Sequence, residues 1–326
     1  MRRRSFLVSS LLLAGCSSQK TERPKVRIGI GGQAQLVYLP TTLAERLKHY
    51  EKEGLDVTLT DFQGGSKALE ALLGGSVDVV SGYFDHVIQL NSDGRSLKAF
   101  VTMQRYPGLA LVVSPATQRK VQSIADLKGA VVGVSSPGSS TDLFFRYLLQ
   151  KNGLTPEDVS VTGVGMSAGA VAAMERAKVD AAIMADPAIT QLARRSKGEL
   201  RILADGRTAA GVKEMFGVEQ YPAAVFYSTA DWLAKNAVTA AALSKAMKQT
   251  LAYIQLNPDS IAAAMPKEFQ GDDPALYADA VKRALPMYSP DGRMPEDGPA
   301  AVKHVLSVTL AKVRDANINL RETYTE

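Results

Sequence analysis

One arrangement of short apolar runs and helix-period segments occurs twice along this chain, and this duplication constrains the fold most strongly. The first copy has predicted strands and helices at residues 26–30, 41–52, 55–59, 66–73 and 77–80. The second copy has them at residues 131–134, 142–151, 159–162, 167–176 and 180–185. Such alternation is typical of mostly parallel sheets flanked by helices. The sequence therefore predicts an α/β protein with two lobes built alike.

Matching landmarks support the duplication. Gly54-Leu55, Ser66 and Val77-Asp78 of the first copy correspond to Gly153-Leu154, Ser167 and Val179-Asp180 of the second. Two further extended runs, 109–114 and 223–228, flank the second copy. If they cross between the lobes, the segment from about residue 231 returns to the first lobe, and the two crossings form a hinge.

These boundaries give a domain organisation. We expect lobe 1 to contain residues 26–112 and 229–326, and lobe 2 to contain residues 113–228. Residues 1–15 are interpreted as a signal peptide, and residues 16–25 as a lipidated cysteine followed by a polar tether.

The start of the chain carries this export signal. Arg2, Arg3 and Arg4 precede an apolar run at 6–14, which is shorter than the ~20 residues of a membrane-spanning helix. Cys16 follows Leu-Ala-Gly in a segment that resembles the lipobox of bacterial lipoproteins. We therefore expect a lipid anchor at Cys16 and a location in the periplasm or on the extracytoplasmic face. Because Cys16 is the single cysteine, no disulfide within the chain and no cysteine-based metal site is expected.

Charge and histidine content exclude other classes of function. The net charge of +5 falls to +2 without Arg2, Arg3 and Arg4, which argues against nucleic-acid binding. The three histidines lie far apart, without the spacing of a metal site. We expect no metal and no cofactor.

Several motifs resemble those of a known family. Residues 121–129, together with Pro137-Gly138-Ser139, resemble the entry to the second lobe of ABC-transporter substrate-binding proteins. With Gly64-Gly65-Ser66 and Asp186-Pro187, the chain is similar to their nitrate, sulfonate and taurine (SsuA/THI5-like) branch, of the type II periplasmic-binding-protein fold. The resemblance implies a monomeric, non-enzymatic protein that captures a small organic ligand by hinge closure and delivers it to a permease. The ligand would be a sulfonate-, nitrate- or taurine-like anion, or a heterocyclic or aromatic compound.

Candidate ligand-binding residues follow the predicted strands. A helix start leaves backbone N–H groups free, so Ser139, Ser140 and Thr141 could bind an anion or a carbonyl, although Ser140 or Thr141 is also expected to cap the helix. Other candidates in equivalent loops are Gln35, Tyr38, Gly65, Ser66, Tyr83 and Asp85, with His86 as an alternative to Asp85.

Two further candidates point to opposite ligand chemistry. Arg105 could bind a carboxylate, sulfonate or nitrate through two parallel hydrogen bonds. Asp186, at the end of a predicted strand, would favour a ligand with an amine or a ring N–H. The class of ligand therefore stays open at this point.

One enzymatic alternative exists. Residues 165–169 match G-x-S-x-G, the nucleophile elbow of serine hydrolases, with Ser167 as the nucleophile. The only histidine after it is His304, which lies in a strongly helical segment instead of a loop. This makes a hydrolase the second interpretation.

Overall fold

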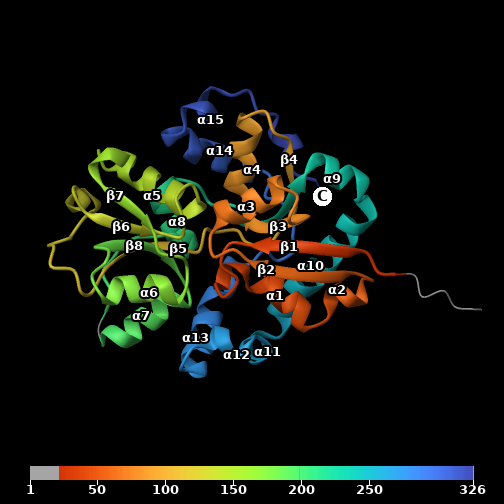
Figure 1. The fold of residues 1–326 in the computed structure, drawn as a ribbon, viewed down its shortest axis with the longest axis horizontal. Coiled ribbons are helices and arrows are strands. Elements are labelled where there is room, and N and C mark those ends of the chain that lie inside the picture. Colours follow the sequence, from red (N-terminus) through yellow and green to blue (C-terminus); the bar gives the residue numbers. More distant parts are fainter. Residues whose placement is uncertain (1–21, 198, 326) are drawn as a thin grey trace, which may run out of the picture.

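Two five-stranded sheets, each flanked by helices, form the two lobes of the computed structural model, which describes residues 22–197 and 199–325 (Figure 1). The first sheet has the spatial order β2 (Asp56–Asp61), β1 (Lys25–Ile30), β3 (Val79–Tyr83), β10 (Ala224–Thr229) and β4 (Leu97–Thr102). The second has the order β7 (Ser160–Gly163), β6 (Val131–Val134), β8 (Ala181–Ala185), β5 (Leu109–Val113) and β9 (Ile202–Asp205).

The two sheets have the same plan. In each, one strand runs antiparallel to both of its neighbours, namely β10 in the first sheet and β5 in the second. The pairs of β1 with β2 and β3, and of β6 with β7 and β8, are parallel. Each sheet is therefore mixed, with two parallel and two antiparallel pairs, and the predicted α/β fold class with two lobes is confirmed.

Helices cover both faces of each sheet. Those of the first lobe are α1 (Leu39–Arg46), α2 (His49–Lys52), α3 (Gly65–Leu73) and α4 (Phe84–Ser92). Those of the second are α5 (Ser140–Lys151), α6 (Ala168–Glu175), α7 (Ala188–Ser196) and α8 (Ala209–Phe216). The remaining helices are α9 (Ala230–Lys235), α10 (Ala237–Leu256), α11 (Ile261–Ala264), α12 (Lys267–Gln270), α13 (Pro274–Ala284), α14 (Gly298–Thr309) and α15 (Ala311–Asp315).

The chain crosses between the lobes twice. The strand pairing puts β5 in the second sheet and β10 in the first, so each crossing precedes these strands. The division at residues 112/113 and 228/229 stays a prediction, and the pairing favours crossings one strand earlier. The segment after β10 packs mainly on the first lobe, where α10 contacts α1, α2 and β4.

The predicted helix at 41–52 is two helices. α1 ends before Lys48, which has a left-handed backbone with φ of 59°, and α2 begins at His49. The periodicity of the apolar residues continues through this break, which explains why sequence alone did not reveal it.

An equivalent aspartate fixes the third strand of each copy. The Asp78 carboxylate accepts a hydrogen bond from the backbone N–H of Arg27 at 2.8 Å, and the Asp180 carboxylate accepts one from the backbone N–H of Val131 at 2.9 Å. In return, the backbone N–H of each aspartate donates to the carbonyl of the same partner, at 2.8 and 2.7 Å. The matching aspartates of the sequence therefore have the same structural role.

The segment at 323–325 lies along the edge strand β4. The backbone N–H of Ala99 donates to the Thr323 carbonyl at 2.9 Å, and the N–H of Thr325 donates to the Ala99 carbonyl at 2.8 Å. Within the described residues, no helix combines the length and the apolar character needed to cross a bilayer.

The shared role of Asp78 and Asp180 generates a stability prediction. Asp180→Ala removes the bonds to the Val131 N–H and to the Thr117 hydroxyl at 2.6 Å, and should lower the free energy of unfolding by about 1.5–3 kcal/mol. Asp78→Ala should have a similar effect. Urea titration followed by circular dichroism measures both, with Asp56→Ala on exposed β2 as the control. Equal midpoints for Asp180→Ala and the control would contradict the assignment.

Candidate functional site

Loops at the carboxyl ends of strands from both sheets lie against one another between the lobes. The first lobe contributes the loop after β1 and the starts of α3 and α4, and the second contributes the loops after β6 and β7. We call this contact the interlobe site. Its central cavity is lined by Gly31, Val37, Tyr38, Gly65, Tyr83, Leu109, Ser135, Ser139, Ser140, Thr141 and Met166.

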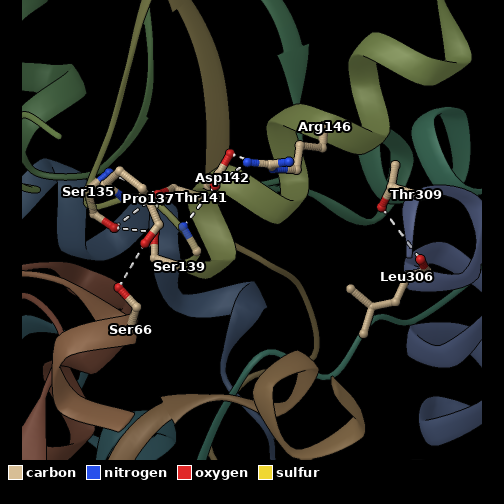
Figure 2. A network of polar contacts seen from close by, with 10 residues as sticks. Ser66, Ser135, Pro137, Ser139, Thr141, Asp142, Arg146, Leu306 and Thr309 are labelled. Atoms are coloured by element: carbon tan, nitrogen blue, oxygen red, sulfur yellow. Dashed lines mark hydrogen bonds and ion pairs between the residues drawn. The ribbon is translucent and has the colours of Figure 1, made fainter. Parts of the chain in front are cut away.

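Ser66 reaches across to the second lobe. Its hydroxyl lies 2.7 Å from the Ser136 hydroxyl. It also donates to the Pro137 carbonyl at 3.1 Å (Figure 2). The helix α3 starts at Gly65 with Gly64 as its N-cap, so Ser66 does not cap it. The Ser66 side chain therefore contacts the second lobe instead of capping its own helix.

Three hydroxyl groups form a triangle at the start of α5. The Ser135 and Ser139 oxygens are 2.7 Å apart, Ser135 and Thr141 are 2.9 Å apart, and Ser139 and Thr141 are 2.7 Å apart (Figure 2). The expectation that Ser140 or Thr141 caps α5 is wrong, since Ser139 occupies the N-cap position without a side-chain capping bond. The Thr141 hydroxyl instead accepts from the backbone N–H of Ser135 at 2.9 Å.

A carboxylate already compensates the positive end of α5. Asp142, in the first turn and fully buried, accepts from the backbone N–H of Gly138 at 2.8 Å and pairs with Arg146 at 2.9 Å (Figure 2). A negative group at a helix N-terminus lowers the attraction for a second anion. The start of α5 is therefore less suited to an anionic ligand than its sequence indicated.

Asp85 joins the lobes through a buried carboxyl group. It lies in the first turn of α4, is 2% exposed, and accepts a hydrogen bond from the Ser140 hydroxyl of the other lobe at 2.8 Å. Burial raises the pKa of Asp85, an effect that nearby His86 and the Ser140 hydrogen bond partly oppose. The carboxyl is thus a hydrogen-bonding group aimed at the contact between lobes.

His86 lies at the same place with unused hydrogen-bonding capacity. The side chain is fully buried, and neither ring nitrogen has a partner among the described residues. A Cβ on Gly65 would lie 3.1 Å from His86 Cε1, and 4.0 Å from the Ser139 Cβ. The imidazole therefore borders the interlobe site with two buried nitrogens that have no partner among the described residues, and its role in binding stays a prediction.

Tyrosines and an amide complete the surroundings. Tyr38 and Tyr83 pack edge to face with ring centroids 6.1 Å apart, and burial raises the pKa of both phenols, which stay neutral donors. The Tyr83 hydroxyl donates to the Pro107 carbonyl. The Gln35 amide nitrogen donates to the Met166 carbonyl and to the Ser167 hydroxyl, while its oxygen has no partner among the described residues.

The central cavity has a volume of about 10 Å³, roughly the room of one water molecule. The described residues that line it include no lysine and no arginine. A cavity of this size has no room for a small organic molecule in this arrangement of the lobes, and its polar lining consists of hydroxyl and phenol groups.

Arg105 and Asp186 lie outside the residues that line this cavity. The Arg105 guanidinium donates to the Pro286 carbonyl at 3.0 Å and lies 5.5 Å from the centroid of the Tyr106 ring. Asp186 pairs with Arg207 at 3.0 Å and accepts from the Thr190 hydroxyl at 2.6 Å. Their role in ligand binding stays a prediction.

Ser167 lacks the surroundings of a catalytic nucleophile among the described residues. It precedes α6, as the G-x-S-x-G interpretation requires, but its hydroxyl accepts from the Gln35 amide at 3.1 Å and no histidine bonds to it. His304 lies inside α14, where a helix fixes it. Within residues 22–197 and 199–325, no group of three metal-binding side chains occurs.

Comparison with known proteins identifies relatives of this architecture. The profile of the NMT1/THI5 like family matches residues 35–261. A solved structure of a protein from Bordetella bronchiseptica RB50 is 39% identical, with a TM-score of 0.89 over 94% of this chain and 96% of the other.

Two more distant structures share the fold. The alkanesulfonate-binding protein SsuA of Xanthomonas axonopodis pv. citri, bound to MOPS, is 20% identical with a TM-score of 0.72, covering 93% of this chain and 99% of the other. The periplasmic nitrate-binding protein NrtA of Synechocystis PCC 6803 is 15% identical with a TM-score of 0.68, covering 93% and 86%. The chain therefore has the two-lobed periplasmic-binding-protein fold.

Gly64 offers a direct test of the contact between lobes. A Cβ there would lie 2.5 Å from the Ser136 hydroxyl and 3.1 Å from its Cβ, both on the other lobe, while the φ of −168° suits any residue. Because such overpacking costs about 1–3 kcal/mol, Gly64→Ala should lower the ratio of closed to open molecules by roughly tenfold. Small-angle X-ray scattering should then give a larger mean radius of gyration.

Gly163→Ala is the matched control, since a Cβ there meets its nearest neighbour at 3.5 Å. It should leave the radius of gyration unchanged. The same radius for both variants and the unmodified chain would show that Gly64 does not limit closure.

Proposed function

We propose, from the premise that the chain belongs to the NMT1/THI5-like family, that it is the extracytoplasmic solute-binding component of an ABC importer. The lobes close over a small organic ligand at the interlobe site, and a permease recognises the closed form. The observation that carries this proposal is the hydrogen bond from Ser140 to buried Asp85, which joins the lobes through groups suited to bind a ligand.

Closure is a change of conformation without a chemical step. Two packed lobes and two crossing segments form a hinge, and a ligand that contacts both lobes stabilises the shut arrangement. We propose that the protein acts as a monomer, which size-exclusion chromatography tests. The hydrolase alternative has less support, because Ser167 bonds to Gln35 instead of a histidine.

The polar groups of the site favour a ligand that donates hydrogen bonds. Asp85 and the Gln35 oxygen accept, and no lysine or arginine lines the described cavity. The α5 N-terminus is compensated by Asp142. Although SsuA and NrtA are named for sulfonate and nitrate, we propose for this chain a heterocyclic or aromatic compound that carries an amine or a ring N–H.

Ligand class can be tested by thermal unfolding. Aminopyrimidines and other heterocyclic amines should raise the melting temperature more than methanesulfonate or nitrate, because their N–H groups can donate to the acceptors of the site. A ligand at 100 times its Kd stabilises the native state by about 2.7 kcal/mol. Asp85→Asn should weaken binding of the best compound by roughly tenfold or more, the effect of losing a hydrogen bond to a charged group. Asp231→Asn, exposed on α9, is the control.

The stability of the Asp85→Asn variant separates an effect on binding from an effect on folding. Because burial raises the pKa of Asp85, the folded state holds its proton more tightly than the unfolded state, and this carboxyl destabilises the fold increasingly as pH rises above its ordinary pKa of about 4. Asp85→Asn should therefore be at least as stable as the unmodified chain at pH 8, with a smaller difference at pH 4. Stabilisation by methanesulfonate alone, unaffected by Asp85→Asn, would overturn the ligand class.

The membrane anchor is a separate proposal. Cys16, its lipidation site, lies outside the described residues, as do the signal peptide and most of the tether. Cys16→Ser should move the protein from the membrane pellet to the soluble fraction, because the lipid has no other attachment point. Ser17→Ala is the control and should stay with membranes. A Cys16→Ser protein that still sediments with membranes would contradict the anchor.

A further inference from the structure

A second contact between the lobes lies at the start of α7, where α13 of the first lobe approaches the lower edge of the second lobe (Figure 1). The backbone N–H of Leu36, in the first lobe, donates to the carbonyl of Asp186, in the second, at 2.8 Å. The Arg283 guanidinium, near the end of α13, donates to the Thr190 hydroxyl of α7 at 3.1 Å. None of these four residues is among those that line the central cavity of the interlobe site.

The second-lobe side of this contact is held by the Asp186 carboxylate. One of its oxygens accepts from the backbone N–H of Thr190 at 3.1 Å and from the Thr190 hydroxyl at 2.6 Å. The other accepts from the Arg207 guanidinium at 3.0 Å. These bonds fix the Asp186 peptide to the first turn of α7, so that its carbonyl and the Thr190 hydroxyl move together with the second lobe.

The first-lobe side is connected through the segment that follows α13. The Tyr288 hydroxyl, in a side chain that is 1% exposed, donates to the Leu36 carbonyl at 2.8 Å. Tyr288 directly follows the short 3-10 helix η5 (Leu285–Met287), which continues from α13. Leu36 and Arg283 are therefore both held by residues 283–288, and the two bonds to the second lobe come from one connected part of the first lobe.

The same segment is bonded to the first crossing between the lobes. The backbone N–H of Arg105 donates to the Met287 carbonyl at 2.8 Å, and the N–H of Ser289 donates to the Met103 carbonyl at 2.8 Å. The Arg105 guanidinium donates to the Pro286 carbonyl at 3.0 Å. Because these bonds fix η5 at the crossing, rotation of the second lobe about the crossings would move α7 relative to α13.

Packing around the two interlobe bonds is loose. Thr190 lines a cavity of about 230 Å³, and Arg283 lines another of about 170 Å³. Side chains that face a cavity lose the dispersion contacts that a packed interior supplies on every side. The contact between α7 and α13 therefore depends on its hydrogen bonds, and it can break without disruption of an apolar core.

We propose that Leu36, Asp186, Thr190 and Arg283 form a latch that stabilises the closed arrangement of the lobes independently of the ligand. This inference rests on the proposed function, because a latch has a role only in a protein whose lobes open and close. A bias toward the closed form raises the apparent affinity for a ligand that binds that form. Ligand affinity and release would thus be set in part by residues outside the central cavity.

The Leu36 bond can be removed by a substitution that suits the backbone. Leu36 is the first residue of the 3-10 helix η1 (Leu36–Tyr38), a position that accepts proline, and Gln35 before it is extended, with φ of −77° and ψ of 143°. Leu36→Pro deletes the N–H and puts a ring carbon against the Asp186 carbonyl. Leu36→Ala is the matched control, since it removes the buried side chain and keeps the N–H.

The Arg283 bond has its own matched pair of variants. Arg283→Met keeps the length of an exposed side chain and removes its donors. Lys282→Met, next to it on α13, removes an exposed charge that pairs with Asp259, away from the second lobe. Compared with their controls, Leu36→Pro should lower the ratio of closed to open molecules by about tenfold, and Arg283→Met by about threefold.

Pulsed electron paramagnetic resonance measures this ratio without a ligand. Nitroxide labels at Lys151→Cys, on α5, and Lys235→Cys, on α9, report the distance between the lobes in the full chain carrying Cys16→Ser. Opening gives a second population of distances, which Leu36→Pro and Arg283→Met should enrich. Circular dichroism should show the same melting temperature for Arg283→Met and Lys282→Met, which separates release of the latch from unfolding.

The outcomes distinguish failure of the latch from failure of the proposed function. Identical distance distributions for Leu36→Pro and Leu36→Ala, or for Arg283→Met and Lys282→Met, would overturn the latch. If Gly64→Ala nevertheless enriches the second population, the lobes do open, and the proposed function stands without the latch. A single distance shared by all these variants, Gly64→Ala included, would overturn hinge closure and the latch together.

Discussion

The hydrogen bond between Ser140 and Asp85 connects the lobes through a carboxyl group that is almost completely removed from water. Such a group destabilises the interior unless a partner satisfies it, and here the partner belongs to the opposite lobe. Separation of the lobes would take the partner away and return water to the carboxyl in one step. The closed and open arrangements of the lobes can therefore have similar free energies. Under this condition the binding of a small ligand can shift the population from one to the other.

Much of the architecture could be predicted because it depends on local patterns repeated in two copies. The apolar strands, the glycines after the helices and the aspartates Asp78 and Asp180 are all short-range signals, and the paired aspartates bond to equivalent backbone groups. Sheet membership was harder. β5 and β10 read as extended runs, but only tertiary pairing decides which sheet each one joins. The break at Lys48 was also hidden, since a left-handed residue leaves the apolar period intact.

The location of the candidate site could be predicted from the sequence, but the contacts of its side chains could be predicted only in part. Loops after the strands do bring Tyr38, Ser139 and Asp85 together, as parallel sheets require. The partners of several side chains belong to the opposite lobe, and local sequence patterns do not predict contacts between segments that are far apart in the chain. Ser140 was expected as a possible cap, yet its hydroxyl crosses to Asp85. His86 follows Asp85 in the sequence, where it was an alternative candidate. Only the structure shows that its ring nitrogens are buried and have no partner among the described residues.

The pairing of residues 323–325 with β4 bears on the tendency of the protein to aggregate. An uncovered edge strand can pair with a strand of a neighbouring molecule and start aggregation. In the first sheet, the late segment occupies the backbone groups of Ala99 on one edge, while the opposite edge strand β2 begins and ends with Asp56 and Asp61. One edge is thus protected by a covering chain and the other by charge, so neither edge offers a free template for a strand of a second molecule.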